Sequence, residues 1–80
     1  MAKYLIIENQ LSLPCAVIFN EALTHKDVAG NMRVQSAGFC SIGQSNDGEY
    51  HVCTWGHSES LGVGRLVSDE SYIKLAMKSY

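Results

Sequence analysis

The chain has 80 residues, of which 46% are hydrophobic and 18% charged. This length suits a single domain spanning residues 1–80, and the composition excludes a disordered chain. The formal net charge is −2, and six Lys and Arg are too few and too scattered to form the basic surface of a nucleic-acid-binding domain.

The sequence also indicates whether the chain spans a membrane and in which compartment it resides. Its longest apolar runs, Tyr4–Ile7 and Cys15–Phe19, are far shorter than the about 20 residues of a membrane-spanning helix. The N-terminal residues lack the separate apolar region and cleavage site of a secretory signal. Three cysteines without a CxxC pair suit reduced thiols. We therefore expect a cytoplasmic protein with no membrane partner and no nucleic-acid partner.

Two strands are predicted at the start of the chain. Lys3–Glu8 is rich in β-branched and aromatic residues, and Cys15–Asn20 follows Pro14, which is tolerated at the first position of a strand. Both segments are almost continuously apolar instead of alternating. Such strands are typical of a sheet that is covered on both faces.

A short helix is predicted next, because its start and stop signals are both present. Thr24 is the expected N-cap, Asp27 completes a pair resembling a capping box, and Gly30 favours the end of the helix. We expect His25 and Lys26 to be exposed residues of its first turn.

Arg33–Gly43 and Glu49–Ser58 are predicted to form a β-hairpin. The turn between them has Asn46 and Asp47 at its centre and Gly48 at a positive φ. Counting back from this turn sets the register, which pairs aromatic and β-branched residues across the strands. The predicted pairs are Ile42 with Val52, Cys40 with Thr54, and Phe39 with Trp55.

The last third of the chain contains a less regular segment and a helix. Leu61–Leu66 is either a short fifth strand or an irregular loop. A helix is predicted after the N-cap Ser68, with Tyr72, Ile73, Ala76 and Tyr80 facing inward. The resulting fold class is α+β, in the order ββαββα, with a mainly antiparallel sheet of four or five strands and two helices.

The predicted register gives both faces of the hairpin large apolar groups. Phe39 and Trp55 lie on one face, and Ile42 and Val52 lie on the other. Two helices, one of them very short, are expected to cover only one face of the sheet. We therefore expect the chain to form a homodimer, with Phe39 and Trp55 at the interface.

The second arm of the predicted hairpin contains several side chains that could bind a metal or act in catalysis. If the strand stays regular, one face presents His51, Cys53, Trp55, His57 and Glu59. Trp55 separates the two halves of this set and no second ligand pair is present, so we predict no metal site. The alternative is a thiol-based site in which Cys53 is activated by His51 and His57, but no oxyanion-binding group is identified.

A second set lies before the last helix. Gly62 and Gly64, with Arg65 and Ser68, have a spacing that can hold an anion, although a flexible turn is the favoured interpretation. The dinucleotide fingerprint and the P-loop motif are both absent, and no cofactor is predicted.

The sequence favours a non-catalytic interaction module that binds a protein or a small ligand as a homodimer. The alternative is a small enzyme or ligand-binding protein with a site near His51, Cys53 and His57. A large apolar self-contact would support the first interpretation, and a concave pocket would support the second.

Overall fold

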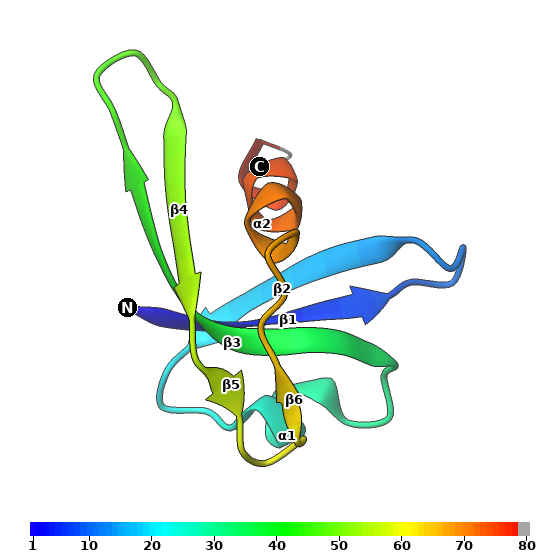
Figure 1. Cartoon of the computed structure of the whole chain (residues 1–80). Helices are drawn as coiled ribbons and strands as arrows, with labels where there is room; N and C mark the ends of the chain where they lie inside the picture. Colours follow the sequence, from blue (N-terminus) through cyan, green and yellow to red (C-terminus); the bar gives the residue numbers. More distant parts are fainter. Residues whose placement is uncertain (79–80) are drawn as a thin grey trace.

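A computed structural model describes residues 1–78 as an α+β fold with a four-stranded antiparallel sheet, a separate two-stranded sheet and two helices (Figure 1). The order ββαββα and the fold class predicted from the sequence are confirmed. The elements are β1 (Ala2–Glu8), β2 (Pro14–Asn20), α1 (His25–Ala29), β3 (Val34–Gln44), β4 (Tyr50–Trp55), β5 (His57–Ser58), β6 (Val63–Gly64) and α2 (Asp69–Lys78).

The four-stranded sheet has the order β2-β1-β3-β4, with every neighbouring pair antiparallel. The first strand of the chain therefore lies inside the sheet, which explains its apolar residues on both faces. The register between β1 and β3 shifts after Ile6, because Ile6 pairs with Ser36 whereas Ile7 pairs with Val34. Gln35 is the extra residue of this β-bulge and is exposed.

The β3–β4 hairpin has the predicted register. Ile42 pairs with Val52, and Phe39 pairs with Trp55. The Ser45 N–H donates to the Glu49 carbonyl at 2.9 Å, and Gly48 has a φ of 88°, as the turn chemistry required. The register therefore follows from a few turn residues.

β4 ends at Trp55, its last paired residue, because the backbone turns at Gly56, which has a φ of 76°. The chain then leaves the four-stranded sheet, and His57–Ser58 pairs with Val63–Gly64. The prediction that the second hairpin arm continues to Ser58 is wrong for this reason. The segment 61–66 contains a short strand, but that strand belongs to the smaller sheet.

One face of the large sheet is covered by α2. Tyr4, Ile6, Cys40 and Val52 pack there around Ile73, which is fully buried. Tyr72 and Ala76 of the predicted inward stripe are partly buried, whereas Tyr80 lies outside the described residues.

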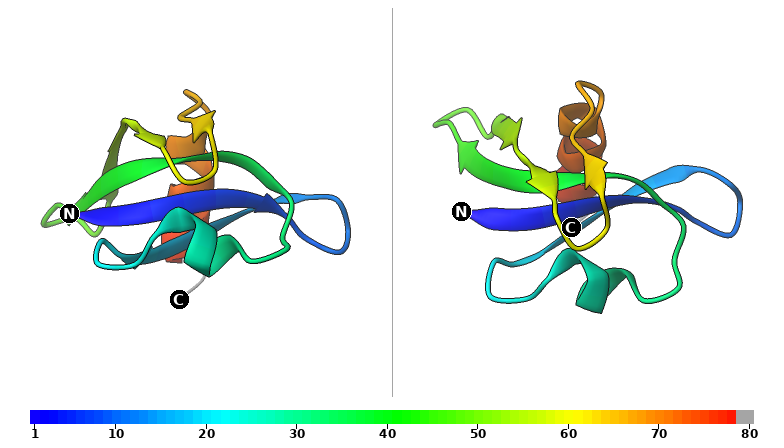
Figure 2. Two further views of the ribbon diagram at one scale, coloured as in Figure 1. Left: turned by 90° about the horizontal axis from the view of Figure 1, so that it is seen from below. Right: turned by 60° about the horizontal axis from the view of Figure 1, so that its bottom comes forward.

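The other face is covered by α1 and by the β5–β6 segment. Leu5 and Ala37 are buried there against Ala29 of α1, and Leu61 and Val63 pack on the same cluster. Seen from below, α1 and α2 lie on opposite sides of the sheet (Figure 2). The expectation that one face stays uncovered is therefore wrong, because residues 57–64 fold back onto it.

A buried carboxylate attaches α2 to the sheet. Asp69 accepts hydrogen bonds from the Tyr4 hydroxyl at 2.5 Å, the Ser36 hydroxyl at 2.6 Å and the Leu66 N–H at 2.9 Å. Burial, followed by the hydrogen bond to Asp69, raises the pKa of Tyr4 far above its usual value. Three donors satisfy a carboxylate that is only 1% exposed, which fixes the start of the helix.

A second polar link joins α2 to the edge strand β4. Glu70 accepts the Thr54 N–H at 3.0 Å, and the Arg65 guanidinium lies 3.7 Å from the same carboxylate oxygen. None of the helices within residues 1–78 is both long and apolar enough to cross a membrane.

Candidate ligand pocket

The candidate site is built on one row of side chains that crosses the whole sheet. Lys3 of β1 pairs with Phe19 on one side and with Phe39 on the other, and Phe39 pairs with Trp55. Residues paired in register point to the same face. The row therefore presents Phe19, Lys3, Phe39 and Trp55 side by side on the face that carries α1.

Phe39 and Trp55 are stacked, with ring centroids 6.4 Å apart and an angle of 17° between the ring planes. Trp55 is the outermost residue of the row, on the edge strand β4, and it is 40% exposed. Gly56 allows this arrangement, because a Cβ atom at that position would lie 2.9 Å from the Phe39 ring. Both the positive φ and the close approach require glycine there.

The His25 side chain packs over this row of side chains. It lies at the start of α1, is only 4% exposed, and packs edge-on against Phe19 and Phe39 with centroids 5.5 and 5.9 Å away. Its Nε2 lies 2.9 Å from the Gly38 carbonyl oxygen, which can only accept, so Nε2 carries the proton. The expectation that His25 is an exposed surface residue is wrong, whereas Lys26 is exposed.

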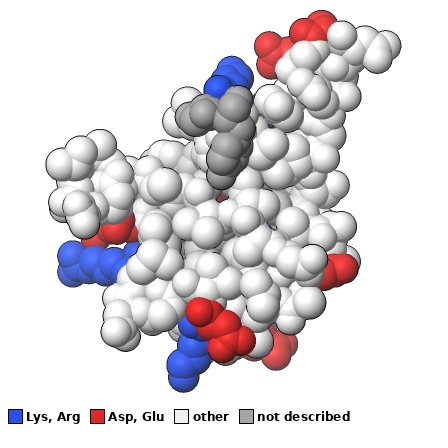
Figure 3. Space-filling model, turned by 180° about the vertical axis from the view of Figure 1, so that it is seen from behind, with Lys and Arg blue, Asp and Glu red and all other residues white. Residues whose placement is uncertain are grey.

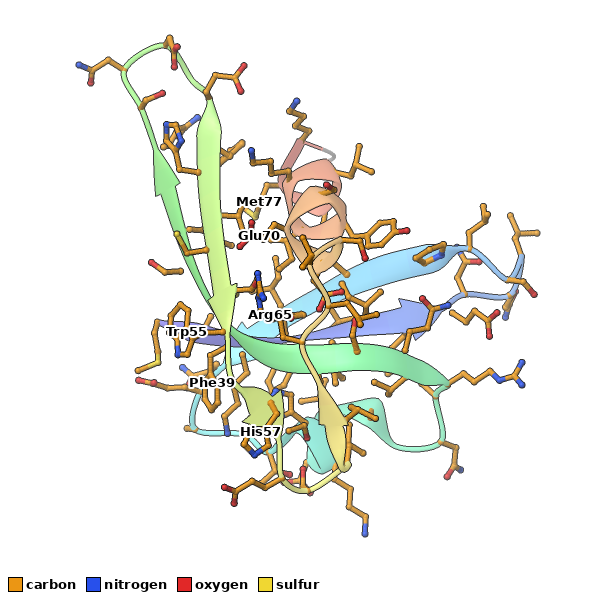
Figure 4. The ribbon with its side chains drawn as sticks, viewed as in Figure 1. Phe39, Trp55, His57, Arg65, Glu70 and Met77 are labelled. Atoms are coloured by element: carbon orange, nitrogen blue, oxygen red, sulfur yellow. The ribbon has the colours of Figure 1, made fainter. Side chains whose placement is uncertain are left out.

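Lys3, His25, Phe39 and Trp55 line a pocket of about 510 Å³ that is open to solvent, whereas Phe19 lies outside its lining. Its volume lies within the range of small-molecule sites, which is roughly 300–1,000 Å³. Figure 4 shows Phe39 and Trp55 projecting together from the sheet, with His57 below them. The residues that give the pocket its chemistry are Lys3, His25, Phe39, Trp55, His57 and Glu59.

The charged and titratable groups of the pocket lie in two places, at Lys3 and at the rim. The Lys3 ammonium donates to the Leu23 carbonyl at 2.7 Å and lies 5.8 Å from the Phe39 ring centroid. Within residues 1–78 this ammonium makes no second hydrogen bond, which leaves two of its three N–H groups without a protein acceptor. At the rim, the His57 Nε2 lies 4.0 Å from a Glu59 carboxylate oxygen, and both side chains are mostly exposed.

Two hydroxyl groups also line the pocket. Thr24 Oγ1 accepts the Asp27 N–H at 3.0 Å as the N-cap of α1, and Ser60 Oγ accepts the Lys26 N–H at 3.2 Å. Each hydroxyl therefore has a backbone partner that orients it, which confirms the predicted role of Thr24 in capping.

The structure separates the residues that the sequence placed on one strand face. His51 and Cys53 are exposed on β4, paired with Gly43 and Ser41, and they do not line the pocket. His57 and Glu59 follow the turn at Gly56 and reach the pocket from the β5–β6 segment. A regular strand through these positions, on which the grouping depended, does not form.

The predicted anion-binding set has other partners. The Arg65 Nε donates to the Thr54 hydroxyl at 2.5 Å, and its guanidinium pairs with Glu70. Gly64 pairs with His57 in the small sheet, and Ser68 directly precedes α2. The Arg65 side chain is therefore committed to α2 and β4, and an anion site here stays a prediction.

The remaining charges are dispersed. No group of three or more His, Cys, Asp or Glu side chains within residues 1–78 has the geometry of a metal site. Seen from behind, the Lys and Arg side chains lie at the margins of the molecule beside acidic ones, and the turn of the hairpin is acidic (Figure 3). Basic groups do not gather into one patch on this face.

Comparison with known proteins adds no further assignment. No family model matches the chain, and neither a curated protein nor a solved structure matches it.

Proposed function

We propose that this chain is a non-catalytic binding protein that holds a small ligand in the pocket beside Phe39 and Trp55. The observation that carries this proposal is the stacked pair itself. Two large aromatic rings, one of them 40% exposed, line a pocket of about 510 Å³ together with a few oriented polar groups. Such a combination is typical of ligand sites.

The chemistry of the lining residues favours binding over catalysis. The two hydroxyl groups each accept a backbone N–H and have no imidazole hydrogen-bonded to them within the described residues. The buried His25 uses Nε2 to hold the Gly38 carbonyl. A nucleophile needs an adjacent base, and Cys53, the thiol in the alternative enzyme hypothesis, lies outside the pocket.

Trp55 is the only tryptophan of the chain, so its fluorescence and its indole N–H resonance report directly on the pocket. A library of small aromatic and aliphatic fragments should contain compounds that change both signals in a saturable manner. Trp55→Ala should weaken binding of these compounds, measured by calorimetry. Leu75→Ala, an exposed change on α2 at the opposite face of the sheet, is the matched control. A library that leaves both Trp55 signals unchanged contradicts the proposal.

A second candidate function is the interaction module, formed as a homodimer in the cytoplasm. The exposed Trp55 on an edge strand favours it, because large aromatic groups at an edge are common in interfaces. Two exposed free cysteines, Cys15 and Cys53, support a reducing compartment. Light scattering should give about twice the 8.8 kDa chain mass, and Trp55→Ser should lower it. A constant 8.8 kDa mass over micromolar concentrations contradicts the dimer.

A further inference from the structure

We infer that the ligand of this pocket carries an N–H or O–H group that donates a hydrogen bond to Nδ1 of His25. The inference rests on the proposed function and names the class of ligand, a small hydrogen-bond donor. Three observations carry it: the proton on Nε2 of His25, the lack of a protein partner at Nδ1, and the place of His25 in the pocket lining.

The first observation fixes the proton of the imidazole. Nε2 of His25 lies 2.9 Å from the carbonyl oxygen of Gly38, so Nε2 is the donor of this contact. A neutral imidazole carries one N–H group, and its other ring nitrogen is then an acceptor. Nδ1 of His25 therefore presents a lone pair whenever the ring is neutral.

The second observation is that Nδ1 has no protein partner. Within residues 1–78 the hydrogen bond to Gly38 is the only one that the His25 ring makes. The ring is nearly enclosed, because His25 is 4% exposed and Phe19 and Phe39 pack against it edge-on. Acceptors in such surroundings are normally paired, and one without a protein partner is paired by water or by a ligand.

The third observation places this lone pair in the pocket. Among residues 1–78 no side-chain nitrogen or oxygen is both sealed from solvent and unpaired, so Nδ1 keeps contact with solvent. His25 belongs to the lining of the pocket, and the two phenylalanine rings cover it elsewhere. The contact of Nδ1 with solvent is therefore through the pocket.

The lone pair selects ligands because a ligand at this point removes solvent from it. A ligand with a donor replaces the hydrogen bond to water by one of its own. An apolar group or an ether oxygen has no donor and leaves Nδ1 unpaired in a buried position. His57 and Glu59 at the rim are mostly exposed and keep their contact with water, so they discriminate less between ligands of equal shape.

Two matched pairs of probes test the donor. Benzofuran has the shape of indole, with an ether oxygen in place of the N–H group. Fluorobenzene has the shape of phenol, with fluorine in place of the hydroxyl group. Calorimetry and the Trp55 indole N–H resonance measure each affinity at pH ~8, above the ordinary histidine pKa of about 6.5. Indole and phenol should each bind roughly tenfold more tightly than their partners, the effect of one neutral hydrogen bond.

The ring nitrogens of His25 give a direct readout, because long-range proton–nitrogen spectra distinguish a protonated from an unprotonated nitrogen. In the free protein Nε2 should carry the proton and Nδ1 should not. Saturation with indole or phenol should shift the Nδ1 resonance towards that of a hydrogen-bonded nitrogen, whereas benzofuran and fluorobenzene should not. His51, exposed on β4 and outside the pocket lining, is the internal control and should keep its resonances.

The test variant is His25→Leu, which removes the lone pair and keeps an apolar side chain against Phe19 and Phe39. It should lose the preference for indole over benzofuran while still binding benzofuran. Lys26→Ala, an exposed change on the same helix, should retain the full preference. If His25→Leu does not fold, the nitrogen resonances of the unmodified chain decide alone.

The outcomes distinguish this inference from the proposed function. If the members of each pair bind equally, if the Nδ1 resonance does not respond to indole, or if His25→Leu keeps the preference, the assigned hydrogen bond is wrong although the pocket binds ligands. If none of the four probes binds, the fragment library decides, and hits without an N–H or O–H group contradict the inference. If no compound of that library perturbs Trp55, the proposed function itself fails.

Discussion

The imidazole of His25 donates a hydrogen bond from Nε2 to the carbonyl oxygen of Gly38, 2.9 Å away, and so joins α1 to the centre of β3. The same ring packs edge-on against Phe19 and Phe39. A helix of five residues has little stability of its own. His25 therefore supplies much of what holds α1 on this face of the sheet.

His25→Ala removes this hydrogen bond and leaves a cavity under α1. The free energy of unfolding should fall by about 2–4 kcal/mol, a large share of the stability of so small a domain. Urea denaturation followed by circular dichroism measures the change. Lys26→Ala, the exposed neighbour, should change stability by less than about 0.5 kcal/mol. Equal effects of the two substitutions would contradict the role assigned to His25.

Gly56→Ala should be more damaging than Gly48→Ala. Both glycines have a positive φ, so each substitution strains the backbone by about 1 kcal/mol. Only at Gly56 does the new Cβ also approach the Phe39 ring, at 2.9 Å, whereas nothing lies within 4 Å of it at Gly48. We expect a larger loss of stability for Gly56→Ala, with a shift in Trp55 emission that Gly48→Ala does not cause. Thermal melts and emission spectra test both parts.

The buried Tyr4 hydroxyl predicts a loss of stability in alkali. Its pKa in the folded protein is raised, so the folded state keeps this proton when the unfolded state releases it above the usual tyrosine pKa of about 10. Stability should then fall with rising pH, by about 1.4 kcal/mol per pH unit above pH ~10. Below that pH the contribution is fully present.

Tyr4→Phe isolates this effect. The variant should be less stable near neutral pH, by about 1–3 kcal/mol, because the buried Asp69 loses one of its three donors. Its stability should fall less steeply above pH ~10 than that of the unmodified chain. Denaturant titrations at a series of alkaline pH values measure both slopes. Identical slopes would show that Tyr4 ionises as readily when folded as when unfolded.

The three cysteines should react in two classes. Cys15 and Cys53 are exposed, and Cys40 is buried in the cluster under α2, where burial raises the pKa of its thiol. A thiol-specific reagent should modify two groups rapidly in the native protein and the third only on unfolding. Total titration in denaturant without reductant should find three thiols. Finding one would show that a disulfide forms.

The hairpin register was predictable because its signals are local. Asn46, Asp47 and Gly48 define a turn through their own backbone preferences, and every pair up to Phe39 with Trp55 follows by counting. The capping of α1 by Thr24 is local for the same reason. Such features need no knowledge of the rest of the molecule.

The pocket was only partly predictable because its parts meet through tertiary packing. The sequence places Phe39 and Trp55 on one exposed face. Lys3, in contrast, lies in an apolar strand, and no pattern in the sequence indicates that it lines a pocket. His25 follows an N-cap, a position that is usually solvated, and its burial depends on Phe19 and Phe39 from two other strands. The segment 59–67 has no hydrophobic period, so its return onto the sheet had no signal in the sequence.

The position of residues 57–78 after the last strand of the large sheet has a consequence for folding during synthesis. One continuous stretch, residues 57–78, first packs on the α1 face and then passes β3 to become α2 on the other face. All four strands of the large sheet and α1 therefore leave the ribosome before α2 and the β5–β6 segment exist. During that interval the apolar row around Tyr4 faces solvent, and the cluster around Leu5 has only α1 as its cover. A nascent chain ending near Trp55 is accordingly the species most in need of a chaperone.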